Sequence, residues 1–563
     1  MQRSDSEIIR FKTHLQQALL ICSDRCLYIS SKWAAEILDG IDDRQLNQDS
    51  NYTQNADNAA SIATYSTEYE SSLPALTEKE YNKYQYAKAL FQMRQYDNVA
   101  FILSNYTHPK LVFLKLYAKY LAGEKRKEEH TQDILGASET SLAENTELNS
   151  LYEELHDLHD KKSLDAFGLY LYGIVLRKCK LDKLAASALL ESVRQYEYNW
   201  SAWMELGSLA TTRKNFLDLQ TTLAKQMKDS IMKDLFLARL ALEMHLPSDT
   251  FWELMRPLAG CFPNSIYIKS QLAAACYDMF DYNEAEALFD EMRKEQPYRI
   301  EDMDIYSNLL YLQDSRHKLS LLAHDCVRID RYRPETCCIV ANYYSITREI
   351  AESVEYFKRA LKLDRNYHLA WTLLGHDYIE MKNTNAAIEC YRRAINVNSR
   401  DYRAWYGLGQ AYEILSLPYY ATYYYKKATE LRPYDARMWK ALGACYAILQ
   451  EDQDAAGCYT RAAECDNEGK HGILIQLARV FDKMGKKAMA SQYFKRAFEK
   501  YQEVGHYKEE VAEAALFLAR ENAMLCKWEE AEKYAKVAQD YKYPYYDDSK
   551  SLLDEIRIKQ ASM

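Results

Sequence analysis

The sequence predicts an all-α protein built as a solenoid of helix–turn–helix repeats, and two observations support this. The first is a period: Trp371, Trp405 and Trp439 are spaced 34 residues apart, and each begins the same pattern of large and small residues. The second is composition, since the 563 residues include only 16 Gly and 10 Pro, which favours long helices over sheets and turns. A fixed period indicates repeats that stack into one continuous core.

The register inside the three strongest repeats identifies their type. Each tryptophan is followed by a Leu-Gly pair and a tyrosine, and Ala, Tyr and Ala recur in the second half. This content at this period is typical of tetratricopeptide (TPR) repeats, so we expect a superhelical solenoid of roughly 12 to 14 of them. Small residues are needed where two helices approach and large residues fill the space around them. The positions predicted to be structural are Trp371, Gly375, Ala387, Trp405, Gly409, Ala421, Trp439, Gly443 and Ala455.

The chain divides into segments by register and composition. The weaker repeats upstream and downstream of the tryptophans keep the same spacing, whereas one early segment is rich in Asn, Gln, Ser, Thr and Asp, which is typical of a flexible linker. The predicted segments are an N-terminal helical segment (1–42), the polar linker (43–76), an N-terminal TPR array (77–265) with a charged insertion near 123–163, a C-terminal TPR superhelix (266–540) and a C-terminal helix or tail (541–563).

Charge and composition exclude several classes of partner. The formal net charge is −10, which provides no electrostatic reason to bind nucleic acid. The 13 Cys are scattered without the spacing of metal ligands, and reduced, buried thiols fit best. No signal-peptide pattern is present, and no apolar stretch reaches the ~18–20 residues of a membrane span. We expect a soluble protein of the nucleus and cytoplasm that binds no metal, nucleic acid or membrane.

The chain shows no residue pattern typical of catalysis. It has no Gly-rich phosphate loop, no nucleophile elbow and no pair of His with zinc-ligand spacing on a helix. Its 12 His are dispersed, and even His376, in the strongest repeat, has no evident partner that would make it a general base. We therefore predict a protein that is not an enzyme and needs no cofactor.

The repeats themselves indicate where binding occurs. First helices line the concave groove of a TPR superhelix, and we expect the positions beside each Leu-Gly pair to face it. These positions carry an amide, aromatic rings and carboxylates, which suit an extended peptide with a cationic side chain. The alternative is that they are merely solvated. The predicted groove residues are Asn342, Tyr343, His376, Asp377, Tyr406, Gln410 and Glu413.

Several segments are more specific than the general TPR pattern. They are YLAGEK at 120–125, FGLYLYG at 167–173, QPYRIE at 296–301, RPETCC at 333–338 and DYRAWYGLG at 401–409. With these segments the chain resembles the TPR subunits of the anaphase-promoting complex (cyclosome), in particular the subunit-eight type, from about residue 10 to beyond residue 500.

The resemblance implies a scaffold in a multi-subunit ubiquitin ligase that drives mitotic progression. Family members form homodimers through their N-terminal repeats, and their C-terminal superhelix holds other subunits and a short arginine-containing motif of the coactivator. Asn342 and Asp377 match the positions that the resemblance implies for contact with that arginine.

Two other classes of function stay open at this point. The first is a generic TPR adaptor or chaperone cofactor. Chaperone cofactors of the TPR type use a carboxylate clamp, in which Lys and Asn recur at groove positions. The corresponding positions hold Cys338 and Asn342, Thr372 and His376, Tyr406 and Gln410, and Lys440 and Ala444. An enzyme with a TPR arm is the other, but no remaining stretch has the length or pattern of a catalytic domain.

Overall fold

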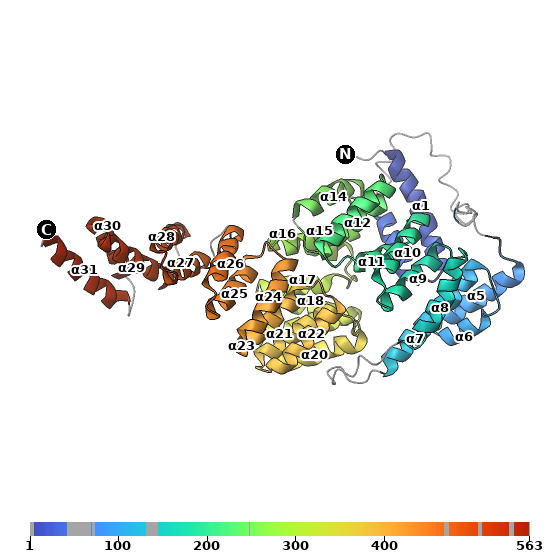
Figure 1. The fold of residues 1–563 in the computed structure, drawn as a ribbon. Helices are drawn as coiled ribbons and strands as arrows, with labels where there is room; N and C mark the ends of the chain where they lie inside the picture. Colours follow the sequence, from blue (N-terminus) through green and yellow to red (C-terminus); the bar gives the residue numbers. More distant parts are fainter. Residues whose placement is uncertain are drawn as a thin grey trace. The chain divides into compact units, whose positions relative to one another are not determined.

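The computed structural model confirms that the chain is all-α over the residues it describes (Figure 1). Those residues form 29 helices and no strand. They comprise 5–41, 69, 74–130, 145–246, 248–466, 472–504, 509–539 and 545–561. The predicted linker 43–76 lies almost wholly outside the described residues, as do parts of the predicted insertion 123–163 and of the predicted tail 541–563.

The chain forms two compact units, Met1–Arg365 and Asn366–Met563. The predicted boundary between the N-terminal TPR array and the C-terminal TPR superhelix, at residue 265, falls inside the first unit. It separates two predicted functions and stays a prediction. The helices of the first unit are α1 (Asp5–Asp24), α2 (Tyr28–Asp39), α5 (Glu78–Gln92), α6 (Tyr96–Ile102), α7 (Pro109–His130), α8 (Leu148–Asp160), α9 (Ala166–Lys178), α10 (Asp182–Gln195), α11 (Trp200–Ser208), α12 (Arg213–Gln226), α13 (Ile231–Glu243), α14 (Ser248–Cys261), α15 (Ile266–Asp278), α16 (Tyr282–Glu295), α17 (Met303–Leu312), α18 (Arg316–Ile329), α19 (Pro334–Ile346) and α20 (Ile350–Leu363).

The second unit continues the same alternation of paired helices. Its helices are α21 (His368–Glu380), α22 (Thr384–Val397), α23 (Tyr402–Ile414), α24 (Pro418–Leu431), α25 (Ala436–Ile448), α26 (Asp452–Cys465), α27 (Ile473–Lys483), α28 (Lys487–Val504), α29 (Glu509–Met524), α30 (Trp528–Gln539) and α31 (Tyr545–Ala561). Within each unit, helices that follow one another pack together, as in α21 with α22 and α23 with α24. This is the helical solenoid that the 34-residue period predicts.

The turn inside each strong repeat depends on a residue other than glycine in the left-handed conformation. Lys382, which follows α21, has a φ of 60°. The N–H of the next residue, Asn383, donates to the carbonyl of Tyr378 at 2.8 Å, which closes the helix end as a Schellman motif. The same conformation recurs at the corresponding positions Arg348, Ser416 and Gln450. A side chain in this conformation costs roughly 1 kcal/mol relative to glycine, so the turn depends on packing around it.

The glycine of each repeat packs under a tyrosine ring. A Cβ atom built on Gly375 would lie 2.5 Å from the ring of Tyr391, and one built on Gly407 would lie 2.6 Å from the same ring. Tyr391 is fully buried, so its ring is held between consecutive first helices, α21 and α23. Ala387, the other small residue predicted to be structural in this repeat, is also fully buried. The close approach in the structure is therefore backbone to aromatic ring.

The recurring tryptophans hold the loops between repeats. The indole Nε1 of Trp405 donates to the carbonyl of Ser399 at 2.9 Å, and that of Trp439 donates to the carbonyl of Pro433 at 2.8 Å. Each acceptor lies six residues before its tryptophan, in the loop that precedes the first helix. Trp371 is buried, whereas Trp405 and Trp439 are half-buried. The tryptophan thus fills space and also satisfies a loop carbonyl.

The N-terminal helices α1 and α2 pack along the first unit rather than extending away from it. The ring of Trp33 on α2 stacks on that of Trp200 at the start of α11, with centroids 4.1 Å apart and planes 4° apart. Arg25, between the two helices, forms a buried ion pair with Asp165 at 3.3 Å. Because Asp165 also caps α9 through Gly168, this pair connects the N-terminal segment to a repeat 140 residues away.

The far end of α2 is attached by further charged contacts within the same unit. Arg299 donates to Glu36 at 2.6 Å, and its side chain is 9% exposed. Lys32 forms an ion pair with Glu301 in the same loop. Gly40 lies so close to Ser265 that a Cβ atom would be 2.4 Å from its side chain. The segment therefore bridges several repeats through contacts that no local sequence pattern encodes.

Candidate functional site

The predicted groove residues fall in both compact units, and each part is described by itself. Asn342 and Tyr343 lie on α19 in the first unit. The remaining five, on α21 and α23, lie in the second unit: His376, Asp377, Tyr406, Gln410 and Glu413.

Asn342 is buried, with 3% of its surface exposed. Its Nδ2 donates to Ser307 Oγ and to Asn308 Oδ1, both at 2.8 Å, and both acceptors lie on α17. The two amide hydrogens therefore hold α19 against α17. A guanidinium is a donor only, so it would have to use the amide carbonyl of Asn342. The neighbouring Tyr343 is half-buried, with its ring 5.6 Å from that of Tyr344.

His376 belongs to the packing of α21 against α22. Its Nδ1 forms a hydrogen bond with the Tyr391 hydroxyl at 2.8 Å. Burial lowers the pKa of His376 to about 4, and the attraction of Asp401 only partly opposes this. The imidazole is therefore neutral at physiological pH. It positions the Tyr391 ring and offers a partner no positive charge.

Asp377, the carboxylate that the sequence places beside His376, is 3% exposed. It lies on α21 next to the helix positions that form the core of its repeat. A carboxylate with so little exposed surface can reach a guanidinium only if the partner side chain inserts toward it. The predicted role of Asp377 stays a prediction.

The three residues on α23 form the accessible part of the predicted groove. Tyr406, Gln410 and Glu413 are spaced i, i+4 and i+7, which places them on one face of the helix. Tyr406 and Gln410 are half-buried, and Glu413 is exposed. The Tyr425 hydroxyl donates to Glu413 Oε2 at 2.7 Å, which holds the carboxylate in place. Within the second unit, this face of α23 therefore offers an amide, an aromatic ring and a carboxylate to a partner.

Two acidic residues, Asp401 and Asp435, were not among the groove residues predicted from the sequence. Asp401 and Asp435 cap α23 and α25 through the N–H groups of Arg403 and Arg437, both at 3.0 Å. Asp401 also accepts from Thr372 Oγ1 at 3.0 Å. The Arg437 side chain holds the pKa of Asp435 below its usual range, against the effect of burial. A signal was available, because the two Asp are 34 residues apart and each precedes a helix start.

The described residues include no group of three or more His, Cys, Asp and Glu side chains able to hold a metal ion. Across the same ranges, no helix combines the length and the apolar character that crossing a bilayer requires.

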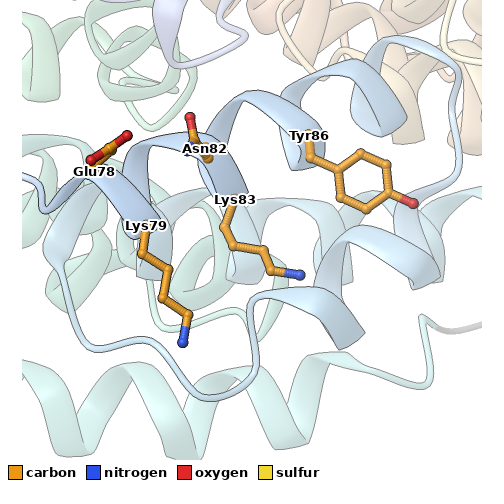
Figure 2. Close-up of a pocket in the computed structure, with 5 residues that line it drawn as sticks. All are labelled: Glu78, Lys79, Asn82, Lys83 and Tyr86. Carbon is orange, nitrogen blue, oxygen red and sulfur yellow. The ribbon is translucent and has the colours of Figure 1, made fainter.

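A surface hollow of about 450 Å³ lies on α5 in the first unit, and none of the predicted groove residues lines it. Figure 2 shows its lining side chains, which all come from this one helix: Glu78, Lys79, Asn82, Lys83 and Tyr86. The ammonium groups of Lys79 and Lys83 extend to one side of the helix, whereas Glu78 and Asn82 point to the other (Figure 2). A ligand site needs polar groups that point toward one common position, so this hollow is not a candidate ligand site.

Comparisons with known proteins agree with the repeat architecture. Residues 10–273 match the family model described as anaphase promoting complex subunit 8 / Cdc23. Residues 375–415 match a TPR repeat model, and residues 334–367 and 471–499 match another tetratricopeptide repeat model. The family match thus covers repeats of the first unit, and the generic repeat matches extend into the second.

Three curated proteins show how far the similarity extends. The anaphase-promoting complex subunit 8 of Arabidopsis thaliana is 45% identical, over 98% of this chain and 97% of its own. The subunit 8 of Dictyostelium discoideum is 38% identical over 98% of both chains. The anaphase-promoting complex subunit CDC23 of Saccharomyces cerevisiae is 31% identical over 68% of this chain and 71% of its own. Since the similarity continues through almost the whole chain and not only through the TPR positions, the protein belongs to the anaphase-promoting complex subunit 8 (Cdc23) family.

Proposed function

We propose that this chain is a non-catalytic TPR scaffold subunit of the anaphase-promoting complex (cyclosome), the E3 ubiquitin ligase of cell-cycle control. The observation that carries the proposal is the 45% identity to the Arabidopsis subunit 8 along nearly the full length of both chains. The helical solenoid supports it, because stacked repeats offer long surfaces to partners. Its partners are then the other subunits of the complex.

The direct test is purification of the tagged full-length chain from dividing cells at native abundance. We expect the co-purifying proteins to be subunits of the anaphase-promoting complex in fixed ratios. A chaperone as the main stoichiometric partner, with no complex subunits, would contradict the proposal and favour a TPR cofactor. Imaging of the same tagged chain tests the expected presence in nucleus and cytoplasm.

Homodimerisation through the N-terminal repeats is part of the proposal and follows from the family resemblance. Light scattering on the purified full-length chain measures it without assumptions about shape. We expect twice the mass of the 65.8 kDa chain at micromolar concentration. A mass of one chain under these conditions would remove the homodimer from the proposal.

We also propose two contacts for the arginine of a short coactivator motif, Asn342 within the first unit and Asp377 within the second, each tested by itself. The chemistry supports this, since an amide carbonyl and a carboxylate both accept hydrogen bonds from a guanidinium. Because the Asn342 amide also holds Ser307 and Asn308, Asn342→Ala combines a binding effect with a structural one. Asp377→Asn keeps the shape of the side chain and removes its charge.

For this site, binding of a synthetic coactivator peptide is compared with that of the same peptide carrying Lys in place of Arg. We expect Asp377→Asn to lower the affinity for the Arg peptide by at least tenfold, because a hydrogen bond to a charged group contributes about 1.5–3 kcal/mol. The Arg preference should shrink in the variant. Equal affinities for wild type and variant, with unchanged melting, would reject the site.

A further inference from the structure

The second helix of one repeat, α24, exposes an unusual number of aromatic rings. Tyr419, Tyr420 and Tyr423 are 73%, 57% and 54% exposed. Tyr419 and Tyr423 are one turn apart and share a face of the helix, and Tyr420 and Tyr424 form a second such pair beside it. With Tyr412 of α23, which contacts the second pair, we call these five residues the tyrosine face.

Comparison with the neighbouring repeats shows that the fold does not require this face. Buried positions recur on all three second helices, as Ala421 and Tyr425 do on α24. The exposed positions do not recur. Those that correspond to Tyr419, Tyr420 and Tyr423 are Asn385, Ala386 and Glu389 on α22, and Gln453, Asp454 and Gly457 on α26. Since the same repeat forms with polar or small residues there, the exposed rings of α24 serve something other than folding.

Three rings of this face, those of Tyr412, Tyr420 and Tyr424, are ordered by contacts with one another before any partner binds. Tyr412 stacks on Tyr420 with centroids 5.4 Å apart, and on Tyr424 with centroids 5.2 Å apart and planes 2° apart. Arg392 Nη2 of α22 donates to the Tyr412 hydroxyl at 2.8 Å. Rigid aromatic rings lose little conformational entropy on binding, which is why Tyr is common in binding surfaces.

The surroundings of the tyrosine face are apolar and cationic. Ile414, Leu415 and Leu417, in the adjoining turn, are 57%, 41% and 42% exposed. Two cations lie at the rim. Arg392 contacts the Tyr412 hydroxyl. Lys426 follows Tyr423 by three residues on α24 and lies 5.3 Å over the ring of Tyr446 on α25, outside the tyrosine face.

Two acidic side chains near this rim are paired with other cations. Glu389 is paired with Arg393 at 2.9 Å, and Glu430 is paired with Lys427 at 2.8 Å. Glu451 and Asp454 act on Lys426 only through longer-range attraction. Arg392 and Lys426, which form no ion pair with an acidic side chain of the described residues, therefore favour negative charge on a partner.

We propose that the tyrosine face is a docking surface for an acidic segment of another protein chain that carries apolar or aromatic anchor residues. The anchors pack on Tyr419, Tyr420 and Tyr423, and the carboxylates pair with Arg392 and Lys426. A basic segment is disfavoured by the same two cations. The inference rests on the proposed function in one respect, which is that the chain works inside an assembly of different chains.

The partner can be identified by placing a photo-crosslinking amino acid at Tyr423 of the full-length chain within the purified complex. The matched control is the same amino acid at Tyr332, which is 76% exposed in the first unit. We expect a cross-link from position 423 to a segment of another chain with net negative charge. A cross-link to a basic segment, to a second copy of this chain, or no cross-link above the Tyr332 control overturns the proposal.

The chemistry of recognition is tested with defined peptides and the full-length chain. One synthetic peptide carries four Glu and two Phe, and its counterparts replace Glu with Lys or Phe with Ala. We expect the Glu/Phe peptide to bind most tightly and the double variant Tyr419→Gln/Tyr423→Gln to weaken it by roughly 10- to 100-fold, as for loss of two aromatic anchors. Lys426→Gln should weaken it less and reduce its salt dependence. Tyr332→Gln should change nothing.

Equal binding of the Glu and Lys peptides, or less than threefold weakening by the double variant, refutes the docking surface. The two proposals fail separately. If the double variant still co-purifies with complex subunits but position 423 yields no cross-link, the docking surface is wrong and the scaffold function stands. If no complex subunits co-purify with the wild-type chain, the scaffold function itself fails.

Discussion

Replacing Gly375 with alanine tests the idea that a tyrosine ring lies directly on the repeat backbone. A Cβ atom at this position would lie 2.5 Å from one Tyr391 ring atom and 2.8 Å from two others. The ring cannot simply move away, because Gly407 lies against the same ring and the Tyr391 hydroxyl is bonded to His376 at 2.8 Å. The added methyl group must therefore displace a helix or force the ring from its rotamer.

The magnitude follows from two opposing effects. Overpacking of a core costs about 1–3 kcal/mol, and the blocked ring places this site toward the upper end. Alanine in a helix interior recovers about 1 kcal/mol relative to glycine. We expect Gly375→Ala to destabilise its repeat by about 1–2 kcal/mol. Gly457→Ala is the matched control, since Gly457 is exposed on α26 and a Cβ there meets nothing within 4 Å. It should stabilise by about 0.5–1 kcal/mol.

Native-state hydrogen exchange of the full-length chain is the suitable assay, because long repeat arrays do not unfold in two states. Amides of α21 to α24 should exchange roughly tenfold faster in Gly375→Ala, because a loss of about 1.4 kcal/mol in stability raises the population of the open state tenfold. Amides of α26 should exchange more slowly in Gly457→Ala. If both variants shift exchange in the same direction, the ring contact does not control packing and the reasoning fails.

Three further predictions concern other contacts. Burial lowers the pKa of His376 from 6.5 to about 4, so between these pH values the unfolded chain binds a proton that the folded chain does not. The contribution of His376 to stability is fully present above about pH 6.5 and falls by at most about 3 kcal/mol as the pH drops toward 4, so hydrogen exchange of α21 and α22 in His376→Gln should accelerate less than in the wild type across this range. Trp405→Phe removes the bond to Ser399 and should cost about 0.5–1.5 kcal/mol, seen as faster exchange of the loop before α23; unchanged exchange would contradict this. Arg25→Met leaves Asp165 buried without its cation and should cost about 3–5 kcal/mol, so limited proteolysis should cut the N-terminal segment faster; wild-type protection would refute the role of the pair.

The candidate groove shows where sequence register stops being informative. The register placed Asn342 and Asp377 toward the groove, and the structure shows that both are 3% exposed. On α23 the register corresponds better to accessibility, because Glu413 is exposed and Tyr406 and Gln410 are half-buried. A repeat period defines which side of a helix a residue occupies. It does not define how closely the next repeat covers that side.

The sequence by itself determined the helical repeat, its register and the family. A 34-residue period is local information repeated many times, and a short segment such as 401–409 carries it together with family-specific residues. Only the tertiary structure decided which residues meet. The Tyr391 ring on two glycines, the burial of Asn342 and the Arg25–Asp165 pair join residues 16 to 140 positions apart. Such contacts depend on the angle and distance between packed helices, which single-chain periodicity does not encode.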